Sequence, residues 1–333
     1  MKQGTLRKFV SAGLLLIIVV IFSLTASSFL TWRNINSILR EVSVVGLLSI
    51  GVSFVIIGGG IDLSTGTVLG LSAMAASRLL TDSPLPVWMI VIVVIAAGVL
   101  LGVVNGLLVV KIGMTEFIAT FAMMYVYRGI VFMIAYREDG RMVTKSVSDA
   151  AFLAIGGKVG GIYYMSVIWA AVVAVSWFVL KETVFGTHVY AIGTNAKSAR
   201  LSGINVPLVK ISTFMISGGC AALAGIFLLA WQGSAGLNTG TGMEFQAIAA
   251  AVVGGIVLSG GRGDTIGVAI GSIFMVSVVN GLYKYGLATE FQTIAYGAVI
   301  IIMSVFDSLY LRWMDRRHIV NKKAAGKAEG EAA

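Results

Sequence analysis

The chain has 333 residues, of which 58% are hydrophobic and 12% are charged, and its formal net charge is +9. Soluble domains are closer to half apolar and a quarter charged, so this composition indicates a membrane-embedded chain. The only cysteine, Cys220, excludes a secreted disulfide scaffold. Most basic residues lie at the ends of apolar runs and in the tail, which argues against a nucleic-acid-binding protein.

Apolar runs recur along nearly the whole chain, and a bilayer core of about 30 Å needs about 20 apolar residues per helix. The alternation typical of a barrel is absent, so we predict an all-α polytopic membrane protein over residues 1–312. The first run is too long for a signal peptide and is expected to be retained. The ten predicted transmembrane segments are 10–30, 42–58, 66–80, 87–110, 116–135, 163–180, 211–231, 244–259, 265–283 and 289–310.

The distribution of lysine and arginine predicts the orientation of these segments. With both termini in the cytoplasm, fifteen basic residues fall inside and eight fall outside. This assignment makes 181–210 a cytoplasmic loop and 136–162 an outer loop, in which Arg137 and Arg141 are candidates for docking a charged partner. A solvated loop without a partner would have the same composition. Residues 313–333 form a charged, alanine-rich cytoplasmic tail that we expect to be poorly ordered.

Two glycine-rich stretches interrupt apolar runs. The first, over 58–70, reads GGGIDLSTGTVLG, where Gly59 and Gly60 break a helix and Asp62 or Ser64 can cap the next one. Asp62 is either such a cap or part of a transport pathway, because an ionisable group at membrane depth is costly. The second stretch, over 254–271, reads GGIVLSGGRGDTIGVAIG and repeats the pattern with Gly260, Gly261 and Asp264. Both a repeated half, as in many transporters, and coincidence among 41 glycines are compatible with this match.

The predicted cytoplasmic loop contains a short helix signal. Asn195 is a natural N-cap, the residues after it favour helix, and Gly203 supplies a left-handed stop. Lys197 and Arg200 share an exposed face, while Ala199 and Leu201 offer apolar contacts. A helix this short needs something to hold it. It lies either on the membrane surface or against a cytoplasmic partner.

Two charged residues near apolar runs have structural explanations. Arg128 either lines a pathway or balances a carboxylate such as Glu116 or Asp62, and we favour a structural ion pair. Glu244 is expected to be a first-turn acid stabilised by the helix dipole. The chain lacks a phosphate-binding loop and has only two histidines, which leaves no enzyme site and no expected metal site.

Three motifs carry a resemblance to a known family. They read GGIDLSTG, YAIGTNAKSARLSGINV and GMEFQAIAAAVVGGIVLSGGRG. In this order they resemble the permease subunits of ribose-type ATP-binding-cassette (ABC) sugar importers, within the monosaccharide and branched-chain amino acid permease superfamily. The likeness runs from about Phe29 to Asp307. The chain departs from the family at Thr65, at Thr194 and at Phe245–Gln246, where the family commonly has Leu-Asp.

The resemblance implies a multi-subunit importer of the bacterial inner membrane. A second permease copy, identical or similar, completes the pore, a cytoplasmic ABC ATPase binds ATP and Mg²⁺, and a periplasmic binding protein delivers a monosaccharide. This chain itself would bind no cofactor and no nucleic acid, and residues 195–203 would be the coupling helix that enters a groove on the ATPase. Trp231, Gln232, Asn238 and Thr239, near the predicted outer mouth, are candidates for contact with a sugar.

Other functions remain open from the sequence. The same machine could carry a polyol, a nucleoside or a furanose-like signal. A secondary transporter could use Asp62 and Arg128 for ion coupling, and uptake would then persist without ATP. A membrane anchor would not need the glycine-rich breaks.

Overall fold

The structure is a computed structural model that describes residues 2–136, 145–288, 290–302 and 305. The described chain is largely helical. Its helices are α1 (Lys2–Thr25), α2 (Trp32–Ile57), α3 (Thr65–Asp82), α4 (Val87–Leu107), the π-helix η1 (Leu108–Ile112), α5 (Glu116–Ala135), α6 (Ala150–Leu153), the 3₁₀-helix η2 (Ala154–Gly156), α7 (Tyr164–Glu182), α8 (Val184–Leu201), α9 (Val206–Gln232), α10 (Met243–Val253), α11 (Thr265–Lys284) and a last apolar helix, Glu290–Ile302.

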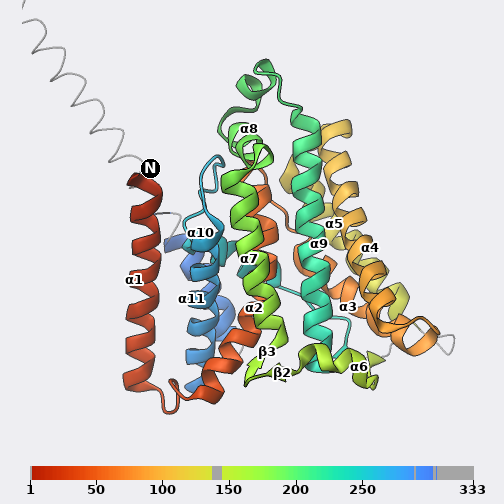
Figure 1. Ribbon diagram of the computed structural model, residues 1–333, viewed down its shortest axis with the longest axis vertical. Coiled ribbons are helices and arrows are strands. Elements are labelled where there is room, and N and C mark those ends of the chain that lie inside the picture. The colour runs from red at the N-terminus through yellow and green to blue at the C-terminus, as the bar shows by residue number, and fades with distance from the viewer. Residues whose placement is uncertain (1, 137–144, 289, 303–304, 306–333) are drawn as a thin grey trace, which may run out of the picture.

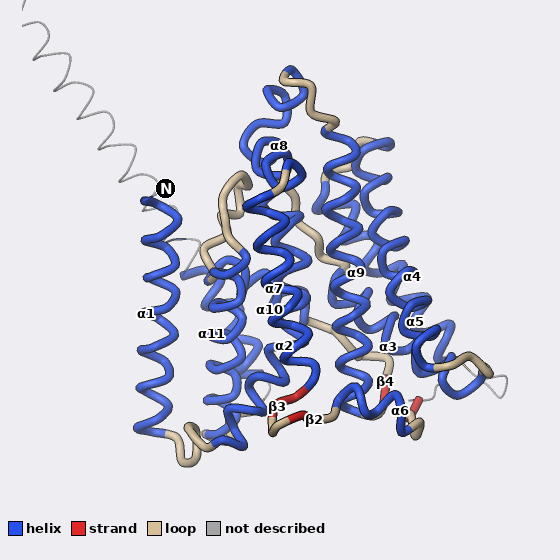
Figure 2. The backbone as a smooth tube through the Cα atoms, in the orientation of Figure 1, coloured by secondary structure: helices blue, strands red, loops and turns tan. Residues whose placement is uncertain are grey.

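Four two-residue strands join the loops at one end of the bundle. They are β1 (Lys145–Ser146), β2 (Lys158–Val159), β3 (Ile162–Tyr163) and β4 (Ser234–Ala235), paired antiparallel as β1 with β4 and β2 with β3. The long helices stand side by side, with α8 at the top and the β2–β3 hairpin at the bottom (Figures 1 and 2). We call these the α8 end and the hairpin end. The predicted cytoplasmic and outer loops therefore lie at opposite ends of the molecule.

Helix α2 forms the centre of the bundle. An 18-residue stretch of it is 89% buried, against 22% for α5. Small side chains make this position possible, because they let neighbouring helices approach closely. A Cβ on Gly46 would overlap the indole of Trp169 in α7, and a Cβ on Gly51 would lie 2.9 Å from Cys220 Cβ in α9. The weakly buried helices α4, α5 and α7 leave apolar faces at the outside of the bundle.

Six of the described helices are long and apolar enough to cross a membrane, and three apolar helices are shorter. The six are α2, α4 with η1, α5, α7, α9 and α11; the shorter ones are Ser11–Thr25, α10 and Glu290–Ile302. Helix α5 has the predicted bounds, but α2 begins ten residues earlier than predicted, at Trp32. Its first turns are polar, yet one of their asparagines packs inside the protein: Asn34 is 6% exposed and hydrogen-bonds to Asn280 of α11.

The prediction that residues 181–210 form a loop is wrong, because α8 occupies most of this range. Val189 and Ile192, three residues apart, are buried on one face of α8, which packs against α7, α9 and α2. Pro207 follows as one of the first residues of α9, where its missing N–H costs nothing.

Helices α4 and α9 lie in close contact over much of their length. Gly98, Gly102 and Gly106 line one face of α4 at four-residue spacing. A Cβ on Gly98 would lie 2.6 Å from the Gly218 carbonyl oxygen, and one on Gly102 would overlap the Phe214 carbonyl oxygen. The glycines therefore let the two backbones touch.

Replacing Gly102 with valine should destabilise the protein by about 1–3 kcal/mol, because the added side chain forces α4 away from α9. Thermal unfolding in detergent, followed by circular dichroism, measures this change. Gly129→Val is the matched control, since nothing lies within 4 Å of a Cβ there. Equal melting temperatures for the two variants would contradict the close contact.

Candidate functional site

The segment after Asn195 is a short capped helix at the α8 end. Asn195 has φ −161° and ψ 100°, so it interrupts the helical path of α8. Its Oδ1 accepts hydrogen bonds from the backbone N–H groups of Lys197 (3.0 Å) and Ser198 (3.0 Å). Gly203 then has φ +84°. The N-cap and the left-handed stop thus lie where the sequence predicts them.

The capped segment exposes both basic and apolar side chains. Lys197 and Arg200 are exposed, and Ala199 is buried at its base. Leu201 is 91% exposed, more than any other large hydrophobic side chain in the part of the chain that the structure describes. Of the two predicted apolar contacts, therefore, only Ala199 is made within this chain.

The base of this segment touches both glycine-rich stretches. A Cβ on Gly193 would overlap the Ile57 carbonyl oxygen and lie 2.6 Å from the backbone N of Gly261. The Gly261 N–H donates a 2.8 Å hydrogen bond to that same carbonyl. A Cβ on Gly260 would lie 2.8 Å from Gly59 Cα. We call residues 57–60, 193–194 and 260–261 the glycine junction.

The two helices that lead into the glycine-rich stretches end in the same way. In each, N–H groups after the helix donate back to carbonyls four and five residues earlier, and the middle glycine has positive φ: +85° at Gly59 and +89° at Gly255. Left-handed backbone of this kind is the usual way to end a helix. The two stretches differ afterwards, since seven residues separate α2 from α3 and eleven separate α10 from α11.

Asp62 lies at the centre of a buried polar network. One carboxylate oxygen accepts hydrogen bonds from Ser64 N (2.9 Å) and Ser64 Oγ (2.6 Å), and the other accepts from Ser217 Oγ of α9 (2.7 Å). Asn105 of α4 donates to Ser64 Oγ (2.8 Å), and Tyr127 of α5 lies 3.0 Å from Asn105 Oδ1. All five residues are at most 1% exposed. The network joins the α2–α3 connection to α4, α5 and α9.

These bonds change the expected role of Asp62 and Ser64. Neither side chain caps α3; Ser64 occupies the N-cap position but donates to Asp62 instead. Sequence reasoning missed Asn105 and Tyr127, although an asparagine inside an apolar run was an available signal.

Asp264 lies in a different setting from Asp62. Its side chain accepts a 2.7 Å hydrogen bond from Ile266 N and so caps α11. Tyr190 of α8 donates to the Gly263 carbonyl (2.8 Å) beside it. Burial, and then the nearby Asp264 carboxylate, raise the pKa of Tyr190 to about 12, which keeps this hydroxyl a donor. The two acids therefore share a sequence pattern but not an environment.

Arg128 is held by carbonyls and not by the predicted carboxylates. Its Nη1 donates to the carbonyls of Leu237 (2.9 Å) and Thr239 (3.1 Å), and it interacts electrostatically with Glu244. Glu116 instead forms an ion pair with Lys210, and Asp62 is bonded as described above.

Glu244 does lie in the first turn of α10, but it is only 5% exposed. A Cβ on Gly66 of α3 would overlap its Oε2, so the glycine provides the space for this side chain.

Two further predictions concern residues outside those that the structure describes. They are Arg137 and Arg141, which were candidates for docking a binding protein, and the tail over 313–333.

Comparison with known proteins identifies the family. Residues 34–304 match the model of the family described as "Branched-chain amino acid transport system / permease component". The chain belongs to this permease family. The permease is 38% identical to the ribose import permease protein RbsC of Haemophilus influenzae, over 91% of this chain and 92% of the relative. No solved structure was found to match it.

Two further relatives are named for other sugars. The permease is 34% identical to the L-arabinose ABC transporter permease protein AraH of Azospirillum brasilense, over 92% of this chain and 90% of the relative. It is 35% identical to the D-allose transport system permease protein AlsC of Escherichia coli, over 91% and 92%. The resemblance drawn from the three motifs is thereby confirmed.

Replacing Asp62 with alanine should destabilise the permease by about 1–3 kcal/mol for each buried donor left without an acceptor. Asp62→Asn should cost less, because it keeps one oxygen and Ser217 Oγ can accept from the amide. Thermal unfolding in detergent measures both. Asp82→Ala removes a carboxylate that is 41% exposed and forms a surface ion pair with Arg78, so it should leave the melting temperature nearly unchanged. A similar loss in Asp62→Ala and Asp82→Ala would contradict the network.

Proposed function

We propose that this permease is the transmembrane subunit of an ABC importer that moves a pentose or hexose monosaccharide across the bacterial inner membrane. A separate ATPase subunit, which binds ATP and Mg²⁺, drives the transport, and a periplasmic binding protein delivers the sugar. Relatives named for ribose, L-arabinose, D-allose and galactose import, each matching most of both chains, support this cargo. A polyol, a nucleoside or a furanose-like signal would use the same machine.

The observation that carries the proposal is the surface of the 195–203 segment. Leu201 extends into solvent beyond the α8 end, next to Arg200 and near Lys197. An exposed leucine flanked by cations suits a groove with an apolar floor and acidic rims on another protein. The Asn195 cap and the Gly203 stop make the segment rigid, so it transmits a displacement that a flexible loop would absorb.

The glycine junction provides the path from this segment into the bundle. A displacement of 195–203 acts first on Gly193, which touches Ile57 at the end of α2 and Gly261 ahead of α11. Both connections would then move together when the ATPase subunits close. Binding of ATP would thus bias the pore between outward- and inward-facing states.

Several features of the arrangement belong to the same proposal. Ten segments would enter the membrane, with glycine-rich breaks in two related halves, and both termini would lie in the cytoplasm at the α8 end. A second permease copy would complete the pore. The candidate spans, the matching ends of α2 and α10 and the opposite placement of the two loops support this arrangement.

Ion coupling through Asp62 and Arg128 has less support. Asp62 already accepts three hydrogen bonds and is 1% exposed, and Arg128 is bonded to two backbone carbonyls. The Asp62 carboxylate is therefore not open to a passing ion in this conformation.

Replacing Arg200 with glutamate and Gly203 with valine in one variant should reduce recovery of the ATPase subunit about tenfold or more, since such changes act at the centre of an interface. The variant is pulled down from its own membranes in mild detergent, and the partners are identified by mass spectrometry. Lys158→Glu at the hairpin end is the matched charge reversal and should recover the ATPase normally.

Normal recovery with the Arg200 and Gly203 variant would overturn the coupling assignment. If the permease is recovered without an ATPase subunit and takes up sugar without ATP, the result would instead support the hypothesis of a secondary transporter.

Replacing Gly193 with alanine should separate assembly from transport. The ATPase should still copurify, because the exposed surface is unchanged, while ATP-driven uptake falls about tenfold as the junction is forced apart. Uptake and ATP hydrolysis are measured in the same proteoliposomes, with Gly129→Ala as control. If Gly193→Ala transports at the wild-type rate, the junction does not transmit the coupling movement.

A further inference from the structure

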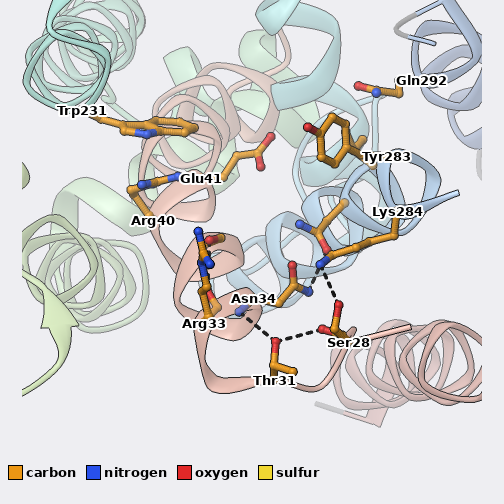
Figure 3. Close-up of a pocket in the computed structure, with 13 residues that line it drawn as sticks. Ser28, Thr31, Arg33, Asn34, Arg40, Glu41, Trp231, Tyr283, Lys284 and Gln292 are labelled. Atoms are coloured by element: carbon orange, nitrogen blue, oxygen red, sulfur yellow. Dashed lines mark hydrogen bonds between the residues drawn. The ribbon is translucent and has the colours of Figure 1, made fainter. Parts of the chain in front are cut away.

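A cavity of about 750 Å³ lies at the hairpin end, away from the coupling segment. Its walls come from α2, the end of α9, the end of α11 and the Glu290–Ile302 helix, with the loop after α1 below (Figure 3). The volume is in the range of small-molecule sites and exceeds that of one monosaccharide. For an importer with its coupling segment in the cytoplasm, this is the side from which cargo enters.

The walls hold an unusual number of polar and charged groups for a chain that is 12% charged. Arg33, Arg40, Glu41 and Lys284 all line the cavity. Two of the cations are already engaged. The Arg40 guanidinium lies 4.1 Å from the centroid of the Trp231 ring and donates to Tyr163 (3.2 Å), while Lys284 bonds to a serine of the loop after α1.

Glu41 is the acceptor that faces the space. Its carboxylate points into the gap between Trp231 and Tyr283 (Figure 3). Within the described residues no hydrogen bond and no ion pair to this carboxylate is found, and the charged side chain that acts on it electrostatically is Arg40. A half-buried carboxylate with free lone pairs beside an open cavity is suited to accept hydrogen bonds from a ligand.

The mixture of charges selects the class of ligand. The carboxyl group of Glu41 lies in the same cavity wall as the basic side chains of Arg33, Arg40 and Lys284, so the cavity presents hydrogen-bond acceptors and donors together. A neutral molecule with several hydroxyl groups can donate to the carboxylate and accept from Arg33 and from the amide of Gln292 at the same time. Tyr283 adds a flat ring against which the C–H face of a sugar can pack.

We propose that the cavity at the hairpin end binds a neutral monosaccharide on its way into the permease, with Glu41 as the main hydrogen-bond acceptor. This inference rests on the proposed function and adds the site of sugar entry. Trp231, a candidate for sugar contact by its place near the predicted outer mouth, packs against Arg40 beside Glu41.

The first test is transport by the complete complex in proteoliposomes, with radiolabelled D-ribose, L-arabinose, D-allose and D-galactose as probes. Glu41→Gln keeps the shape of the side chain but removes its charge and one acceptor. Uptake of the transported sugar should fall about tenfold, the cost of losing a hydrogen bond to a charged group. Asp82→Asn, a carboxylate at the end of α3 and outside the cavity, is the control and should transport normally.

A second test detects binding without turnover. Ser37, which lines the cavity, is replaced with cysteine in a chain whose only native thiol is removed by Cys220→Ser. A membrane-impermeant maleimide should label Ser37→Cys, the transported sugar should slow the labelling several-fold, and Glu41→Gln should abolish that protection. Phosphate and leucine serve as the charged comparison ligands.

The outcomes separate the site from the function. Uptake at the wild-type rate by Glu41→Gln would overturn the cavity assignment, and so would labelling that no transported sugar slows. In either case, ATP-driven uptake of sugar by the native complex would still support the proposed function. Protection by phosphate or leucine in place of sugar would overturn the neutral-ligand assignment. A native complex that takes up none of the four sugars, but whose labelling one of them slows, would sink the proposed transport activity and support the site.

Discussion

The central constraint on this structure is a helix that ends inside an apolar bundle. The last carbonyls of a helix lack intrahelical partners, and a buried polar group without a partner is costly. Helix α2 ends at Ile57, in the most buried part of the molecule, and the Ile57 carbonyl accepts its hydrogen bond from Gly261, some two hundred residues away. That bond is possible only where three backbones touch, which explains why the contact is built from glycines. The three backbones belong to the segment before α3, to α8 and to the segment before α11, so their contact fixes where these helices start or pass.

The Asp62 network solves a related problem with side chains. A carboxylate at this depth is destabilising unless hydrogen bonds replace its water. Ser64 and Ser217 provide those bonds, and Asn105 extends them toward α5. The result is a polar connection across four segments that has directional geometry, in a region where apolar packing alone would allow helices to slide. It holds the α2–α3 connection in place next to the glycine junction.

Sequence reasoning succeeded where a signal is local and failed where contacts are distant along the chain. The Asn195 cap and the Gly203 stop depend on a few neighbouring residues, and the bounds of α5 follow from one uninterrupted apolar run. The contact between the two glycine-rich stretches could not be predicted, because neither sequence pattern carries a signal that points to the other. The partner of Arg128 was missed because it consists of backbone carbonyls, which leave no mark in a sequence.

Polar residues in the first turns of α2 show a further reason for failure. A search for apolar runs discards Arg33, Asn34 and Glu41, because a charge near a membrane segment is taken to mark its end. In the folded protein these residues face a cavity and neighbouring helices, so their polarity is compatible with a continuous helix. The part of α2 that hydropathy excludes is therefore the part that lines the cavity.

The exposure of Leu201 to water also affects the permease when no partner covers this side chain. A leucine that is 91% exposed, at an end of the molecule that we place outside the lipid, is stable in water only at a cost in free energy. In the proposed importer, assembly with the ATPase subunit would cover this side chain, and a permease made in excess of that subunit would keep it exposed to water. Under that proposal, balanced synthesis of the two subunits would limit the number of unpaired copies that could associate through this exposed leucine.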